Sequence, residues 1–385
     1  MKTNNIFLRN IFTFICITIS VAIYGQGTTK TPKGQTINLT DNWDTPTHIA
    51  TWESHATYWI NNFATGVITK KGPATSHYNC HAYAWHISDG GDDEDSWMHG
   101  DILGLPNVAK YWTNDAYSTT SISYKGGYKK LYYGEDADHS AILIGTNGRV
   151  RSKWAHWGLY EHDYHDCPFD TSATYTYYSV PLNGDDIICT TKTYSTVDIN
   201  KATYGWSSSK VSISGSDDSV AATKTGSGEG YIQVDISSPY SGTTVTSEKV
   251  EFWAGPPDLD DFEVYIEELY GDPVSGSPGG PFEVCEGEQY WVCLYPYFLF
   301  DDQGINDVEF DFTFDYDVID EGDDYIEIEV NSSPEDEEGE VYVTSECGYF
   351  TLEWMDFEEG TCGGYFMMIS PNPTTGETTL SIEQG

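Results

Sequence analysis

Apolar and polar residues alternate at every second position over much of the chain, which is typical of β-strands that bury one face. Val, Ile, Phe and Tyr occupy the apolar positions, while Ser, Asp or Glu fill many of the others. The clearest alternating segments are 210–214, 231–236, 308–314 and 325–330. We therefore expect two consecutive all-β sandwich modules, at 191–257 and 258–365.

The first part of the chain has a mixed pattern. Residues 26–190 are rich in aromatic side chains and contain short helical and strand signals, which predicts an α+β domain. Asn79 is a favourable helix N-cap and residues 80–88 contain neither Gly nor Pro, so we expect a helix that begins at Cys80. An apolar strand pattern begins at His139 and ends at Asn147-Gly148, a strong hairpin signal.

The N-terminal segment has the pattern of an export signal. Lys2 and Arg9 accompany an apolar run at 11–22, and the small residue Gly25 follows it. We expect 1–25 to be a cleaved signal peptide, which leaves an exported mature chain without a transmembrane segment. Disulfides persist outside the cytoplasm, so most cysteines of the mature chain should pair.

Charge and histidine occupy different parts of the sequence. Residues 250–385 contain 36 Asp and Glu and no Lys or Arg, whereas all ten histidines lie between His48 and His165. The net charge of −43 repels nucleic acid and excludes it as a partner. The acidic runs 315–324 and 335–338 are either solvated surface or a calcium site, although their spacing does not match an EF-hand loop. We expect no other cofactor.

Seven cysteines remain after removal of the signal peptide, so one is left over from any set of pairs. We expect Cys167 to pair with Cys189, and the four cysteines of the acidic region to pair among themselves. This leaves Cys80. It is either a catalytic nucleophile, because a helix N-terminus favours the thiolate, or a buried structural cysteine.

His139 is the candidate base for Cys80, because it begins an apolar strand in the same predicted domain. With a two-residue turn at 147–148, the hairpin register places His139 opposite His156 and puts Ser152 on the same face. This predicts a Cys-His-polar triad in which His156 orients the base.

Four motifs resemble those of exported bacterial cysteine hydrolases with the papain-like fold, in its NlpC-type and amidase-like forms. They are Asn79-Cys80-His81, Asp138-His139-Ser140-Ala141, Ser152-Lys153-Trp154 and Leu159-Tyr160-Glu161-His162, and the resemblance covers about residues 48–185. It implies an α+β papain-like domain that hydrolyses amide bonds in peptide or peptidoglycan-like substrates, with Cys80 as nucleophile and His139 as base. In this family the third polar residue falls near Ser152. No Gln precedes Cys80 closely, which leaves the oxyanion donor incomplete.

Other interpretations of these residues remain open. A metal site could be formed by His77, Cys80, His81 and His86, although zinc sites use tighter paired spacings. Six aromatic residues could line a substrate cleft or belong to the core: Trp85, Trp97, Tyr111, Trp112, Trp154 and Trp157. Lys153, on the strand face opposite His139, is expected at the surface.

The C-terminal segment 366–385 contains Pro371-Asn372-Pro373, followed by Gly376 and a strand pattern. It resembles the start of the C-terminal sorting domain of type IX secretion cargo in the Bacteroidetes, and the resemblance implies that the type IX secretion machinery is a partner. The two sandwich modules are similar to the immunoglobulin-like repeats of exported bacterial proteins. The sequence therefore predicts a secreted or cell-surface cysteine hydrolase. The alternative is a cell-surface adhesion or binding protein with an inactive N-terminal domain.

Overall fold

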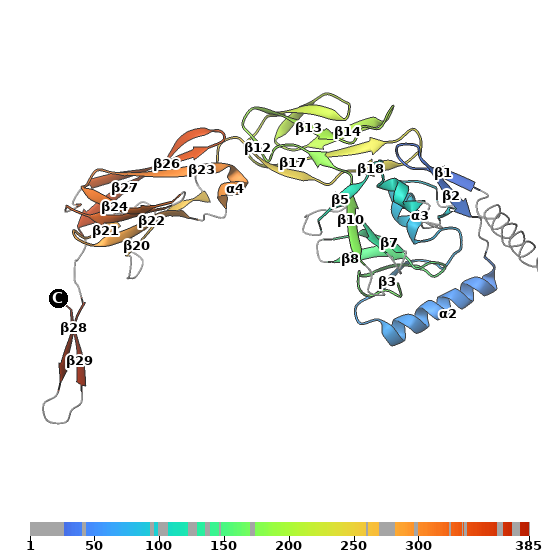
Figure 1. Cartoon of the computed structure of the whole chain (residues 1–385), viewed down its shortest axis with the longest axis horizontal. Helices are drawn as coiled ribbons and strands as arrows, with labels where there is room; N and C mark the ends of the chain where they lie inside the picture. The colour runs from blue at the N-terminus through green and yellow to red at the C-terminus, as the bar shows by residue number, and fades with distance from the viewer. Residues whose placement is uncertain are drawn as a thin grey trace, which may run out of the picture. The chain divides into compact units, whose positions relative to one another are not determined.

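The computed structural model describes most of the chain (Figure 1). The residues described are 27–40, 44–92, 96–98, 107–121, 129–134, 139–145, 148–169, 174–258, 261–268, 282–295, 299–322, 325–332, 334, 337–359, 365–371 and 378–384. The predicted signal peptide at 1–25 lies outside them. Within the described residues, no helix is long and apolar enough to cross a membrane.

The chain forms two compact units. Unit 1 comprises Met1–Asp185, Thr191–Thr223 and Gly230–Glu251. Unit 2 comprises Asp186–Thr190, Lys224–Glu229 and Phe252–Gly385. The domain boundaries expected from composition remain predictions.

The chain is mostly β, with 50% of it in strands and 14% in helices. The expected α+β papain-like architecture of residues 26–190 is therefore wrong. The reason lies in the aromatic-rich segments after residue 118, which alternate at the period of strands and pair with one another into one large sheet. Among the described residues of this region, the helical elements are α2 (Pro46–Phe63), the short α3 (Cys80–Trp85) and two single 3₁₀ turns, η1 (Ile87–Asp89) and η2 (Val108–Tyr111).

The main sheet of unit 1 has seven antiparallel strands in the order β3-β9-β8-β7-β6-β10-β5. Their bounds are β3 (Thr69–Gly72), β5 (Ser118–Thr120), β6 (Lys130–Tyr133), β7 (His139–Leu143), β8 (Arg149–Lys153), β9 (Leu159–Asp163) and β10 (Tyr175–Ser179). A second, three-stranded sheet consists of β1 (Gly27–Lys30), β2 (Thr36–Thr40) and β4 (Trp97–Met98).

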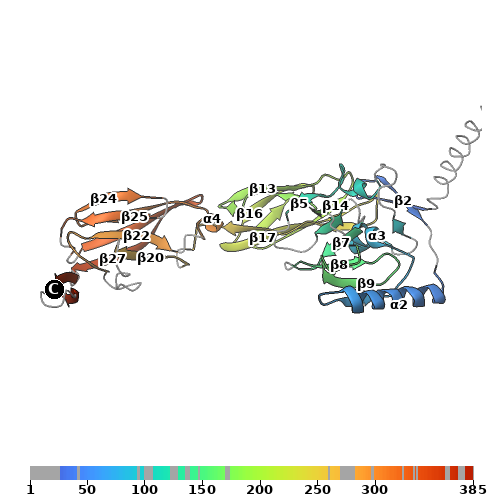
Figure 2. The same cartoon turned by 60° about the horizontal axis from the view of Figure 1, so that its bottom comes forward.

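The two α-helices of unit 1 cover opposite faces of the main sheet. Ala56 of α2 packs in one core with Tyr133 and Ala141 of the sheet. Ala82 and Trp85 of α3 pack in a different core, against the alternate residues of the same strands, including Tyr132 and Ile142. Because neighbouring residues of a strand point to opposite faces, the two cores lie on the two sides of the sheet. The views in Figures 1 and 2 show α2 running along the side next to β3 and β9.

A β-sandwich region follows within unit 1 and shares a core with α3. One sheet has the order β11-β13-β16-β15. The strands of this region in unit 1 are β11 (Leu182–Asn183), β13 (Thr191–Thr196), β14 (Thr203–Ser208), β15 (Val211–Ser214), β16 (Ser219–Lys224), β17 (Gly228–Ser237) and β18 (Thr244–Thr246). Val234 and Val245 belong to the same buried cluster as Trp85. The buried ion pair between Lys129 and Glu248, 3.8 Å apart, adds a polar contact between the two regions.

Unit 2 contains a second pair of sheets, with the orders β20-β22-β25-β24 and β21-β27-β26-β23. Their strands are β20 (Glu263–Glu268), β21 (Phe282–Val284), β22 (Gln289–Tyr295), β23 (Ile305–Phe312), β24 (Tyr316–Glu321), β25 (Tyr325–Val330), β26 (Glu337–Ser345) and β27 (Gly348–Glu359), with a short helix, α4 (Phe300–Gln303). Val292 and Ile328 of one sheet and Phe310 and Val341 of the other share one core. Acidic residues occupy the outward positions of β23, where Glu309 and Asp311 alternate with buried neighbours.

The disulfide in unit 2 differs from the expected pairing. Cys189 is bonded to Cys347, so the predicted pairs of Cys189 with Cys167, and of Cys347 within the acidic region, are wrong. Cys189 follows β12 (Ile187–Ile188), which pairs in parallel with Trp253 and Ala254 at the end of β19 (Val250–Ala254). The pairing of β12 thus places this cysteine in unit 2, a relationship that no local sequence signal records.

The C-terminal strands β28 (Tyr365–Pro371) and β29 (Thr378–Gln384) form an antiparallel hairpin. Part of the predicted sorting-domain motif, at 372–377, lies outside the described residues. Among the residues that are described, no group of three or more His, Cys, Asp or Glu is arranged to hold a metal ion. Residues 323–324 and 335–336 of the acidic runs are not among them, and calcium binding there stays a prediction.

Candidate active site and adjoining aromatic pocket

Cys80 is the first residue of α3, as the sequence predicted. The Asn79 side chain caps the helix, since its Oδ1 accepts the backbone N–H of Ala82 at 3.1 Å. The same Oδ1 accepts the N–H of Met98 at 3.3 Å, which ties the start of α3 to β4. Cys80 itself is 6% exposed, so its position is fixed by a cap and by the core around it. The helix ends at Trp85.

Ser140 of β7 shows which face of the sheet α3 covers. Its Oγ lies 2.8 Å from Nδ1 of His81 and accepts the indole N–H of Trp85 at 2.9 Å. Both partners belong to α3 and all three residues are buried. The face of β7 that carries Ser140 is therefore the face in contact with the Cys80 helix.

Lys153 lies on this same side and is fully buried, so the expectation that it is a surface residue is wrong. Its Nζ donates to the carbonyl oxygens of Thr75 (3.1 Å), Ala155 (2.6 Å) and Trp157. It also lies 5.3 Å from the centre of the Tyr78 ring. Three carbonyl acceptors match the three donors of an ammonium group, and they hold the side chain in one position.

The electrostatics connect Lys153 with Cys80. Burial lowers the pKa of Lys153 to about 7, because the low-dielectric surroundings disfavour its charge. The negative charges of Cys80, Glu53 and Asp44 act in the opposite direction and raise this pKa. Of these three groups, Cys80 has the largest effect on the pKa of Lys153, and it is the only thiol among them. The structure therefore places a buried ammonium group in the field of the candidate nucleophile.

His139 lies on the opposite face of the sheet from α3. It precedes Ser140 in β7, so its side chain points away from the Ser140 face. Its ring stacks on Phe169 with centroids 4.5 Å apart and meets Tyr133 edge-on at 5.0 Å. The predicted pair of Cys80 and His139 is thus not brought together on one face.

The imidazole of His139 is fully buried, and neither ring nitrogen has a hydrogen-bond partner among the described residues. Burial lowers the pKa of His139 well below its usual value, and the neighbouring His162 and His81 lower it further. His139 is therefore neutral at pH 7. A buried polar group without a partner is rare in folded proteins and marks this residue for experimental attention.

The predicted hairpin register is wrong by two residues. Leu143 pairs with Val150 instead of Ser152, because the loop is longer than the two-residue turn at 147–148 that the sequence suggested. The N–H of Ile144 still bonds the carbonyl of Arg149, at 3.0 Å. A shift by an even number of residues leaves Ser152 on the face of His139, as predicted.

His156 does not lie opposite His139, because β8 ends at Lys153. Ala155 has φ +48° and begins a turn that carries His156 out of the sheet. The His156 ring lies between Trp52 and Trp97, with centroid distances of 4.7 and 4.3 Å. Burial lowers the pKa of His156, and the charges of Lys153 and His48 add to this effect.

Ser152 is buried and contacts His162 on the face that also carries His139. Its Oγ lies 2.8 Å from Nε2 of His162, and the indole N–H of Trp154 points at the same nitrogen at 3.2 Å. Because an indole only donates, Nε2 is the acceptor, and Nδ1–H donates to the carbonyl of Asp163 at 2.7 Å. Burial lowers the pKa of His162 to about 4. The motif Leu159-Tyr160-Glu161-His162 contains His162, but no role was predicted for this histidine from the sequence.

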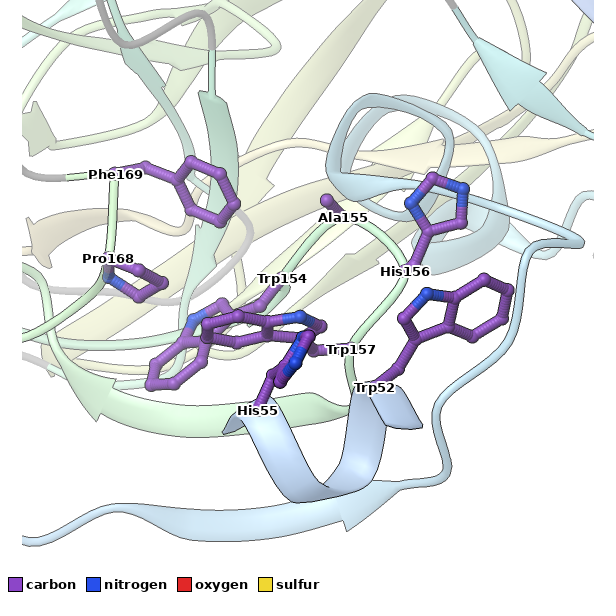
Figure 3. A pocket seen from close by; sticks show the side chains of 8 residues that line it. All are labelled: Trp52, His55, Trp154, Ala155, His156, Trp157, Pro168 and Phe169. Carbon is purple, nitrogen blue, oxygen red and sulfur yellow. The ribbon is translucent and has the colours of Figure 1, made fainter. Parts of the chain in front are cut away.

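An aromatic pocket of about 430 Å³ opens on the side of the sheet that α2 covers. Figure 3 shows Trp52 and His55 reaching up from α2 toward the turn that carries Ala155, His156 and Trp157, with Pro168 and Phe169 on the far side. The pocket is lined by Trp52, His55, Trp154, Ala155, His156, Trp157, Pro168 and Phe169. Lys153 donates to the carbonyls of two of them, so the ammonium near Cys80 also supports the pocket wall.

The aromatic residues singled out from the sequence divide between the two alternatives. Trp157 lines the pocket, and Trp154 both lines it and belongs to the fully buried core on the α2 side. Trp85 and Tyr111 are core residues on the other side, and Trp112 packs against that core. The residues of the suggested metal site do not form a metal-binding group among the described residues. His81 instead bonds Ser140, and His77 lies 4.0 Å from the Asp44 carboxylate.

No known protein family matches the chain, and no curated protein matches it either.

Proposed function

We propose that this chain is an exported cysteine hydrolase that cleaves amide bonds in peptide or peptidoglycan-like substrates, with Cys80 as nucleophile and Lys153 as its supporting cation. The observation that carries the proposal is the buried Lys153 ammonium, fixed by three carbonyls, in the field of Cys80. A cation beside a thiol stabilises the thiolate, which is the form that attacks a carbonyl carbon.

In the proposed reaction, the Cys80 thiolate sulfur bonds to the acyl carbon, the C–N bond breaks, and the departing nitrogen takes a proton from water. The hydroxide formed in this way attacks the thioester, which releases the carboxylic acid and returns the Cys80 thiolate. Lys153 keeps its three carbonyl contacts and supports the thiolate through its charge.

Thiol alkylation tests the proposed pair directly. Iodoacetamide at pH 6 should modify Cys80 about tenfold faster than free cysteine, since a lowered pKa increases the thiolate fraction. Lys153→Met should abolish this advantage, while Lys153→Arg should keep part of it because the charge remains. Cys167→Ala is the matched control, because Cys167 is a second buried cysteine of unit 1 outside α3.

Activity provides the second measurement. Cys80→Ala should abolish the release of new amino groups from peptidoglycan fragments or peptides, and Cys167→Ala should leave it unchanged. The proposal fails if Cys80 is alkylated no faster than free cysteine and Cys80→Ala cleaves every tested amide as well as the native chain does.

A second candidate function is ligand binding at the cell surface without catalysis. The orientation of His139 favours it, because this imidazole faces away from α3 and is in no position to serve as a base for Cys80. In that case the aromatic pocket would be the functional site, and all Cys80 variants would keep full function.

A further inference from the structure

The aromatic pocket has a composition that limits the chemistry of its ligand. Trp52, Trp154, Trp157 and Phe169 supply four aromatic side chains, and the described residues of the lining include no carboxylate, ammonium or guanidinium group. A charged ligand would lose its hydration without gaining an ionic partner from these residues. An anion would in addition be repelled by a chain with a net charge of −43.

The polar atoms of the lining side chains come mainly from two imidazoles. Neither His55 nor His156 makes a side-chain hydrogen bond within the part of the chain that the structure describes. The His156 ring packs against Trp52 and Trp97, with centroid distances of 4.7 and 4.3 Å, and it also lines the pocket. The pKa of His156 is lowered, so the ring is neutral at pH 7 and offers one donor and one acceptor.

A ligand that suits this lining has an apolar face for the indoles and hydroxyl groups for the imidazoles. A sugar ring has both, because its axial C–H groups form an apolar face and its hydroxyls each donate and accept hydrogen bonds. The cavity of about 430 Å³ lies within the range of small-molecule sites. An aromatic amino-acid side chain would fill the apolar part but would leave the two imidazole edges unsatisfied.

We infer that this pocket binds an uncharged saccharide, with a sugar ring against the indole of Trp157 and hydroxyls bonded to His55 and His156 (Figure 3). The pocket residues come from α2, from the turn after β8 and from Pro168-Phe169, so the site is complete within unit 1. This inference does not depend on the chemistry of Cys80.

Calorimetric titration of the full chain with cellobiose, maltose and N,N′-diacetylchitobiose tests the site. At least one of these neutral disaccharides should bind saturably, and Trp157→Ala should weaken that binding by about tenfold or more through the lost ring contact. His55→Ala, at an exposed position of α2, should weaken it with no loss of folding. The matched control is Trp291→Ala in unit 2, and Cys80→Ala should bind as the native chain does.

Three results would overturn the inference. One is that none of the three disaccharides binds when it is titrated to about 10 mM, a concentration at which even very weak binding would be detected. Another is binding that is unchanged in both Trp157→Ala and His55→Ala. The third is saturable binding of N-acetylphenylalanine amide or choline, used as aromatic and cationic probes, in the absence of saccharide binding.

Discussion

The Oγ atom of Ser140 lies 2.8 Å from Nδ1 of His81, and this contact orients the candidate site. It places α3 on the Ser140 face of β7, with Cys80 at the start of the helix. His139, one residue earlier in the strand, therefore faces the side covered by α2. The cation available to Cys80 is Lys153, and the histidine expected as its base belongs to a separate buried cluster with Phe169.

Replacement of His139 by an apolar residue should stabilise the protein. His139→Leu removes two buried nitrogens that have no partner among the described residues, and we expect the free energy of unfolding to rise by about 1 kcal/mol. His162→Leu is the matched control, because it leaves the Trp154 and Ser152 donors unpaired and should cost about 2 kcal/mol or more. Urea denaturation measures both. A large loss of stability in His139→Leu would show that its nitrogens have partners in solution.

Protonation of His162 should reduce stability as the pH falls. The folded pKa is about 4, below the ordinary value of 6.5, so the unfolded state takes up this proton first. The stabilising contribution is fully present above pH 6.5 and is lost as the pH falls toward 4. From pH 7 to pH 5 this amounts to about 2 kcal/mol. Because glutamine does not titrate, the His162→Gln variant should lose about 2 kcal/mol less stability than the native chain between pH 7 and pH 5. Equal losses in the two proteins would contradict the lowered pKa of His162.

The Lys129–Glu248 ion pair should be strongly coupled. Both side chains are buried, and burial lowers the pKa of Lys129 and raises that of Glu248, while the charge of each partner opposes the shift of the other. Lys129→Met should cost about 3 kcal/mol or more, while the double variant with Glu248→Leu should recover most of this loss. The half-exposed pair of Lys192 and Asp185 is a control in which Lys192→Met should change stability by less than about 1 kcal/mol. Additive losses in the double variant would rule out the coupling.

Loss of the Cys189–Cys347 disulfide should destabilise unit 2. The bond joins residues 158 positions apart, and for a loop of this length the chain-entropy estimate gives a stabilisation of up to about 5 kcal/mol. Cys189→Ser and Cys347→Ser should lower the melting temperature equally, and the double variant should show no further decrease. Calorimetry on the full chain measures these shifts. A smaller shift in the double variant than in either single one would point to mispairing of the remaining thiol.

Much of the local structure could be predicted from the sequence because its causes are local. Asn79 caps α3 through its own side chain, so the start of the helix at Cys80 was visible in the sequence. The alternation in 308–312 and 325–330 likewise predicts β23 and β25, since a strand with one buried face must repeat every second residue. The hairpin between β7 and β8 was predicted, but the length of its loop was not.

The site depended on long-range packing that the sequence does not encode in any local pattern. Lys153 was expected in solvent, yet carbonyls of Thr75, Ala155 and Trp157 fold around it and bury its charge. The turn after β8 moved His156 between two tryptophans from distant segments.

The sequence by itself determined alternating strands such as β23 and β25 and the start of α3 at Cys80, because capping and alternation act over a few residues. Only the tertiary structure decided that Lys153, and not His139, shares the face of Cys80, that Cys189 bonds Cys347, and that the aromatic pocket exists. Each of these depends on which surfaces the hydrophobic cores bring together, and that is set by the packing of the whole chain.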